Sequence, residues 1–248
     1  MSINIPVVNL GSLYAQGCEI SYNSTTEVDI AAGQVRDSTN VNDIVISDAI
    51  TLDTAAVGVN GIDTGSLSTN KLYTIYAIGD STANNAGAVL LSLSATAPVL
   101  PNGYDMKRTL GFIRTGGAST FLAGYWSGSS NQRLFMYDAP IATSITAGAA
   151  TTYTAFTLAT FVPAIAGLPV VVAFDMTPAA ASRIMSLHPY GATGDSVSIT
   201  SQVTAVHVTG NAVVQAELNA GVPYIEYKWS AGGGDAVALN VAGYWYNI

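Results

Sequence analysis

Two Gly-Asp-Ser tripeptides, at residues 79–81 and 194–196, are the parts of this sequence that could begin a catalytic site. A serine held in a turn at the end of a strand can act as a nucleophile when a histidine, itself oriented by an aspartate, removes its proton. In the Asp-x-x-His arrangement that serves such a serine, the aspartate stands three residues before the histidine. Neither His188 nor His207 has an aspartate at that position. We therefore interpret the tripeptides as turns, and the sequence predicts a protein that is not an enzyme.

A cluster of oxygen ligands, of the kind that calcium binds, is formed by Asp37, Asn40, Asn42 and Asp43. Its spacing departs from the helix–loop–helix calcium loop, because Asn42 stands where that loop requires glycine. Short Asp and Asn side chains also bond to their own backbone in turns, which explains the cluster without a metal. The sequence predicts a turn and no cofactor, and these four residues are the candidates for a metal site.

Aromatic residues near the ends of the two halves could stack on sugars or pack in a core or subunit interface. The candidates are Tyr125, Trp126, Trp229, Tyr244 and Trp245. We expect most of them in a core or interface, whereas a carbohydrate-binding module would place Trp126, Trp229 or Trp245 at the surface. A glycosidase would need two carboxylates across one cleft, and the 16 acidic residues do not single out a pair.

The composition limits the possible partners. Charged residues make up 10% of the chain, against roughly 25% in a typical soluble domain, so much of the surface is polar and uncharged or is covered in an assembly. A net charge of −8 with only 8 Lys and Arg argues against nucleic acid as the main partner. No apolar run is long enough to span a membrane, and the N-terminus lacks the features of a signal peptide. The single cysteine, Cys18, is consistent with folding in a reducing cytoplasm.

Short alternating or apolar segments between turn residues predict an all-β protein. Clear examples are Leu72–Ile78 and Leu168–Asp175, and we expect two separate strands at Ala205–Val208 and Ala212–Glu217. No helical periodicity with a cap is found. Regularly spaced strands are typical of β-sandwich or jelly-roll-like domains.

An internal repeat suggests where the chain divides. Leu122-Ala-Gly-Tyr-Trp126 and Val241-Ala-Gly-Tyr-Trp245 each end a β-rich half, as the same closing strand of two duplicated units would. Chance similarity in an Ala/Gly-rich chain is the alternative. We predict an N-terminal arm or first strands at residues 1–26 that could dock elsewhere. Two sandwich domains are expected to follow, at residues 27–130 and 131–248.

Short motifs follow one another in a fixed order along the chain. They are Arg36-Asp37-Ser38-Thr39-Asn40, Asn60-Gly61-Ile62-Asp63-Thr64-Gly65, Ile78-Gly79-Asp80-Ser81, Leu90-Leu91-Ser92, Gly103-Tyr104-Asp105, Arg133-x-Phe135-x-Tyr137-Asp138, Gly221-Val-Pro, Tyr227-Lys228 and Val241-Ala-Gly-Tyr244. This ordered set resembles a domain common in virion structural proteins of tailed bacteriophages, often described as tail fibre or structural proteins. The resemblance spans most of residues 33–245.

The resemblance implies a non-enzymatic, β-rich particle component made in the bacterial cytoplasm and located in the virion. It also implies a homo-oligomer, with a trimer favoured, that contacts capsid or tail proteins. We expect a compact surface component, either a short fibre or tail part or a capsid decoration protein. The alternative is a carbohydrate-binding module that recognises a host surface glycan, and a polysaccharide depolymerase is a third hypothesis.

Overall fold

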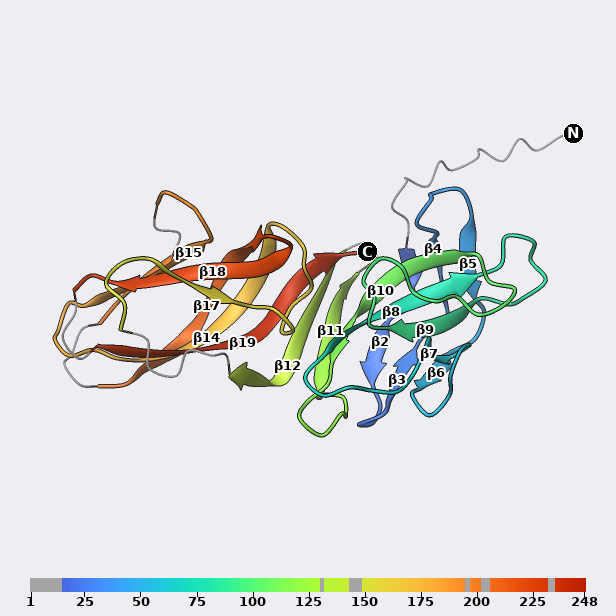
Figure 1. Cartoon of the computed structure of the whole chain (residues 1–248), viewed down its shortest axis with the longest axis horizontal. Coiled ribbons are helices and arrows are strands. Elements are labelled where there is room, and N and C mark those ends of the chain that lie inside the picture. The colour runs from blue at the N-terminus through green and yellow to red at the C-terminus, as the bar shows by residue number, and fades with distance from the viewer. Residues whose placement is uncertain (1–14, 130–131, 143–148, 195–196, 202–205, 232–234) are drawn as a thin grey trace, which may run out of the picture.

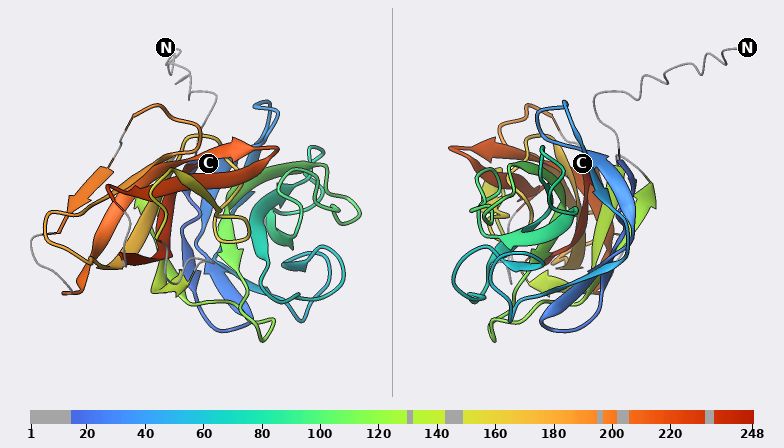
Figure 2. Two further views of the ribbon diagram at one scale, coloured as in Figure 1. Left: turned by 60° about the vertical axis from the view of Figure 1, so that its left-hand side comes forward. Right: turned by 90° about the vertical axis from the view of Figure 1, so that its right-hand side faces the viewer.

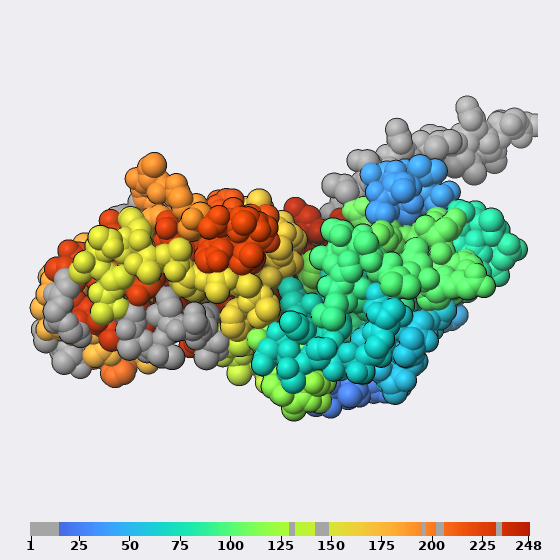
Figure 3. Space-filling view, in the orientation of Figure 1, coloured from blue at the N-terminus to red at the C-terminus, as the bar shows by residue number. Residues whose placement is uncertain are grey.

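The chain folds into strands and connecting turns. A computed structural model describes residues 15–129, 132–142, 149–194, 197–201, 206–231 and 235–248. These residues include no helix, and therefore no helix that could cross a bilayer. The predicted all-β class with sandwich-like architecture is confirmed. Figure 3 shows two lobes, made by the first and second halves of the chain, in contact along a seam.

Nineteen strands are described, and Figure 1 labels most of them. In chain order they are β1 (Ala15–Gly17), β2 (Ile20–Tyr22), β3 (Glu27–Ile30), β4 (Gly33–Arg36), β5 (Asp43–Ile46), β6 (Ile50–Asp53), β7 (Gly61–Ile62), β8 (Leu72–Gly79), β9 (Ala88–Ser92), β10 (Met106–Arg114), β11 (Gly124–Ser129), β12 (Gln132–Ala142), β13 (Thr154–Thr157), β14 (Leu168–Thr177), β15 (Ile184–Pro189), β16 (Val197–Thr200), β17 (Val208–Asn219), β18 (Val222–Trp229) and β19 (Ala236–Asn247).

The first half is built from two layers. Two three-stranded sheets, β1-β4-β5 and β2-β3-β6, are successive stretches of the same three chain passes. The backbone bond from Cys18 N to the Ala32 oxygen (3.3 Å) lies between the two sheets, so together they form one bent layer. The other layer has the order β10-β8-β9-β7. Alternation in β3 places Val28 and Ile30 in the core that both layers share.

The second half is one nine-stranded sheet that curls over itself (Figure 2). Its order is β11-β12-β19-β14-β17-β18-β15-β16, and β13 pairs with β18. Strand β17 pairs with β14 along most of its length and with β18 only over Glu217–Asn219. The sheet turns at that corner and encloses buried residues such as Val172, Leu187 and Trp229.

Buried side chains form a cluster that continues from one half into the other. A β-bulge lies at Leu110 in β10, where the register with β8 shifts. The carbonyl oxygen of Leu110 accepts hydrogen bonds from Arg133 Nη1 and Tyr246 Oη, both at 3.2 Å, and Arg133 Nη2 donates to the Gly17 oxygen at 3.0 Å. An irregularity in one half thus supplies the acceptor for a buried arginine of the other.

A second arginine makes the reciprocal contact. Arg114 of β10 donates from Nε to the Thr160 oxygen at 2.8 Å, and its guanidinium carbon lies 4.8 Å from the centroid of the Phe161 ring. Arg114 is 5% exposed and Arg133 is 4% exposed. The ion pairs of the described residues include neither, so backbone carbonyls satisfy both charges. The seam between the halves is therefore polar at two points inside a continuous apolar core.

The strands at the predicted boundaries belong to sheets. Residues 1–14 of the predicted arm lie outside the described residues, and β1 and β2 from its remainder pair with β4 and β3. Strand β11 precedes residue 130 but pairs with β12 of the second half. The division into domains at 27–130 and 131–248 stays a prediction.

Candidate functional site

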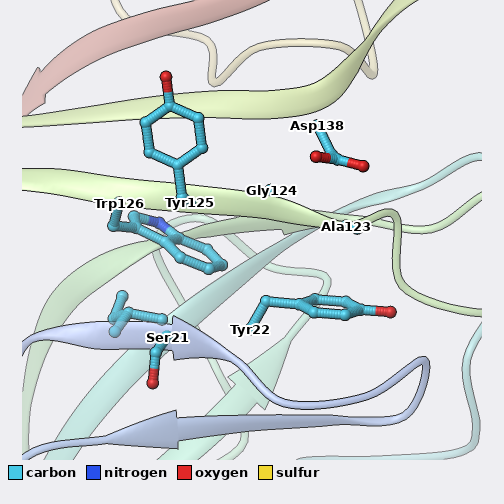
Figure 4. A pocket seen from close by; sticks show the side chains of 8 residues that line it. Ser21, Tyr22, Ala123, Gly124, Tyr125, Trp126 and Asp138 are labelled. Carbon is cyan, nitrogen blue, oxygen red and sulfur yellow. The ribbon is translucent and has the colours of Figure 1, made fainter.

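A groove lies between β2 of the first half and β11 of the second (Figure 4). It has a volume of about 450 Å³. Its lining residues come from β2, from the start of β11 with the preceding Ala123, and from β12: Ile20, Ser21, Tyr22, Ala123, Gly124, Tyr125, Trp126 and Asp138. The groove therefore draws its side chains from both lobes.

The groove exists because two sheet edges meet without pairing. Strand β2 ends the order β2-β3-β6, and β11 ends the order of the nine-stranded sheet. The two strands approach within 8 Å between Cα atoms, but no backbone ladder joins them. A ladder requires strands about 4.8 Å apart, so the seam remains an open crease in the surface.

Consecutive aromatic residues of β11 point to opposite sides of the sheet, as the period of a strand requires. The Trp126 ring packs toward the core, with its centroid 4.8 Å from that of Phe135. Tyr125 projects the other way and is 55% exposed (Figure 4). On the facing strand, Tyr22 is half-buried, and Asp138 on β12 is exposed near the end of the groove. One ring is thus fixed by packing while another is available to a ligand.

Gly124 lets β11 lie close to its neighbour. A Cβ at this position would be 2.6 Å from Phe135 Cζ and 2.7 Å from the Met136 oxygen. Real Cβ atoms do not approach other atoms so closely, so a larger residue would push β11 away from β12. The groove's position depends on this contact.

The second copy of the repeat lies on the other side of β12. Phe135 pairs with Trp126 of β11 and with Tyr244 of β19, so the two Ala-Gly-Tyr-Trp copies are slipped by one residue relative to β12. They do not close equivalent strands of two units, as the duplication hypothesis required. Both lie in one sheet and flank the same strand.

The remaining aromatic candidates lie away from the groove. Tyr244 is 0% exposed and packs on Phe135 at 5.4 Å between ring centroids, and burial raises the pKa of Tyr244 well above its ordinary value. Trp229 is 1% exposed, inside the second half. Trp245 is partly buried on β19. The structure therefore brings only Tyr125 and Trp126 of the five candidates into the groove.

The four metal candidates form a turn centred on one carboxylate. Asp37 Oδ1 accepts hydrogen bonds from the backbone of Val41 (2.9 Å) and Asn42 (3.1 Å). Burial acts to raise the pKa of Asp37, but the bonds from Thr39 and from these backbone groups outweigh it and lower the pKa. Asn40 adopts a positive φ of 60°, and Asp43 pairs with Arg36 at 2.9 Å. The described residues contain no group of three or more His, Cys, Asp or Glu arranged around a common point.

The first Gly-Asp-Ser tripeptide is also a turn. Asp80 accepts bonds from Thr82 Oγ1 (2.6 Å) and from the backbone of Thr82, Asn84 and Asn85, and the bonds from Thr82 lead those that lower the pKa of Asp80 to about 2. The Ser81 hydroxyl donates to the carboxylate of Asp105. The second tripeptide lies partly outside the described residues.

The two histidines occupy different environments. His207 is exposed, with Nδ1 2.8 Å from Asp175 Oδ1, and it lies just before β17 rather than within a strand. His188 lies near the end of β15 and is 1% exposed, with Nδ1 2.6 Å from the Pro189 oxygen.

No protein-family model matches the chain, and no curated protein matches it. Among solved structures, the chain is similar to one from the structure of infectious bursal disease virus Gx strain. The alignment has 14% identity, covers 98% of this chain and 68% of the other, and has a TM-score of 0.22. A likeness at that level carries no argument about function.

Proposed function

We propose that the chain is a non-enzymatic structural protein of a tailed-bacteriophage particle and works there as a homo-oligomer on the surface. The ordered motifs that resemble phage virion proteins support the location. The small charged fraction, 10%, supports an assembled state, because an oligomer covers surface that a monomer would have to solubilise. The observation that carries the proposal is an apolar patch at one edge of the first half.

The patch consists of Val57, Val59 and Val99, which are 67%, 41% and 57% exposed, and we call it the β7 patch. Its residues belong to the two connections that flank β7, namely β6–β7 and β9–β10. Asp63, which follows β7, holds the β9–β10 connection in place.

The hydrogen bonds of Asp63 join chain segments that are distant in sequence. Its Oδ2 accepts from Ser92 Oγ at 2.6 Å and from the Val99 backbone at 3.1 Å. Val99 is therefore presented on fixed backbone. Exposed apolar side chains on connections that lie beside the same strand suit a protein interface.

Strand β7 also ends its sheet. It pairs in parallel with β9 over Gly61–Ile62, and its other side is bonded to the β6–β7 connection, where Val57 bridges to Ile62. Apolar side chains exposed beside this edge are a hazard for a free monomer, and an oligomer covers them. We propose that a second copy covers the β7 patch, that a trimer closes the assembly, and that capsid or tail proteins are the other partners.

Purified particles of the phage that encodes the chain provide the test of location. Gold-labelled antibodies against the chain should decorate the particle surface at a regular site, and mass spectrometry should find the chain in several copies per particle. Finding it only in infected-cell extract, and never with particles, would contradict the proposal.

A further inference from the structure

The groove between β2 and β11 is not used by the proposed assembly, whose surface is the β7 patch. We propose that this groove binds a neutral glycan, with a sugar ring stacked on Tyr125. The inference does not depend on where the chain lies in a particle, because it rests on the side chains that line the groove.

The spacing of the two edges excludes an added strand as the occupant. A strand inserted between β2 and β11 would have to pair with both, which requires them to be about 9.6 Å apart. Their Cα atoms already approach within 8 Å. A ligand must therefore lie across the crease, on the side chains, and cannot use the backbone edges as a ladder.

The aromatic side chains suit a sugar. The apolar C–H face of a sugar ring packs on an aromatic ring as other apolar surfaces do, and tyrosine adds a hydroxyl at its rim. Tyr125 presents its ring to solvent and points away from β2, whereas Tyr22 lies on the facing strand (Figure 4). Both side chains line the groove, and the Tyr125 ring is the exposed surface on which a sugar would stack.

The polar lining selects among glycans. The Asp138 carboxylate is exposed at the groove, and an ionised carboxylate makes strong hydrogen bonds to hydroxyl donors. The eight lining residues include no Lys, Arg or His. With a net charge of −8 on the whole chain, the groove has nothing to offset an acidic sugar. Neutral glycans are therefore the expected class.

Packing contacts hold the lining of the groove in place. Trp126 is held by Phe135 from below, and Gly124 keeps β11 against β12. Little ordering of the backbone is needed on binding, which favours affinity. The volume of about 450 Å³ is within the range of small-molecule sites, roughly 300–1,000 Å³.

A printed array of neutral and acidic glycans, probed with the labelled full chain, is the first experiment. We expect binding to neutral glycans that share a terminal or internal hexose, and none to uronic or sialic acid glycans without one. The strongest neutral oligosaccharide is then titrated in solution. No neutral glycan bound, or a preference for acidic glycans, would overturn the proposal.

Variants separate the groove from the rest of the surface. Tyr125→Ala should weaken binding at least tenfold, whereas Tyr125→Phe, which keeps the ring, should bind within about threefold of the natural chain. Asp138→Asn should weaken binding, and Asp48→Asn, a matched exposed aspartate outside the groove, should not. Circular dichroism confirms folding, since an exposed tyrosine is not needed for the core.

The chain's own N-terminus is a competing occupant. A synthetic peptide of residues 1–14 should not bind the full chain or displace the oligosaccharide. Saturable binding of that peptide, lost in Tyr125→Ala, would overturn the glycan proposal.

Discussion

The two Ala-Gly-Tyr-Trp segments have one sequence and two structural roles. The copy in β11 exposes Tyr125 at 55% and lines the groove, whereas the copy in β19 buries Tyr244 completely. Both pair with β12, and a slip of one residue between them reverses which side chains face the core. Register against a neighbouring strand, which four residues cannot specify, decides what each side chain does.

What the copies share is the glycine. A Cβ on Gly243 would overlap the Phe135 carbonyl oxygen and the Met136 sulfur, just as one on Gly124 would press on Phe135 and Met136. Both strands must approach β12 closely, whichever face they present. Close packing of the glycine on β12 is therefore common to both copies, whereas the burial of the tyrosine differs between them.

Removing the tyrosine side chain should cause very different losses of stability in the two copies. Tyr244→Ala empties a fully buried site beside Phe135 and should lower the free energy of unfolding by about 3–5 kcal/mol. Tyr125→Ala removes an exposed side chain and should change the free energy of unfolding by about 0.5 kcal/mol or less. Urea denaturation of both variants gives the comparison, and equal losses would refute the difference in burial.

Adding a methyl group to the glycine should destabilise the chain by a similar amount in the two copies. Gly243→Ala and Gly124→Ala should each cost about 1–3 kcal/mol, because a well-packed contact with β12 must open. Gly117→Ala is the control, since a Cβ there meets nothing within 4 Å. If either β12-facing glycine behaved like Gly117, the close approach of that strand would be wrong.

Removing only the hydroxyl tests the burial of Tyr244 at its polar end. That oxygen is buried with no hydrogen-bond partner among the described residues, so Tyr244→Phe should be neutral or slightly stabilising at pH 7. Burial raises the pKa of Tyr244 in the folded chain, so above pH 10 the unfolded chain loses this proton while the folded chain keeps it.

Stability should therefore fall as the pH rises above 10, and it should fall less in Tyr244→Phe. Tyr125→Phe controls for the loss of an exposed phenol. Denaturation at pH 8 and pH 11 measures the effect. If the stability of Tyr244→Phe fell between pH 8 and pH 11 as much as that of the natural chain, the burial of the Tyr244 hydroxyl would be wrong.

The strands themselves could be predicted from local sequence. Leu72–Ile78 lies within β8, and Leu168–Asp175 lies within β14, because apolar and β-branched runs of that length fit only buried strands here. The gap expected between Val208 and Ala212 was wrong. Strand β17 continues through Gly210, which pairs with Phe174, because β14 offers a partner for each residue of that stretch.

The groove could be predicted only in part. Tyr125 and Trp126 were candidates because aromatic residues gather there, but nothing in the spacing indicated Tyr22 or Asp138. Tyr22 is about a hundred residues away in sequence and reaches the groove through the seam that Arg114 and Arg133 hold. A contact between two unpaired edges leaves no periodic signal in either strand.

Light scattering at two protein concentrations, which gives the native mass, tests whether the chain assembles through the β7 patch. The full chain should have about three times its mass of 25.5 kDa at both concentrations. Val57→Asp combined with Val99→Asp should reduce it to the monomer, whereas Val213→Asp, at a valine 49% exposed on β17, should leave it unchanged. A monomeric natural chain, or a double variant that keeps the full mass, would contradict the account.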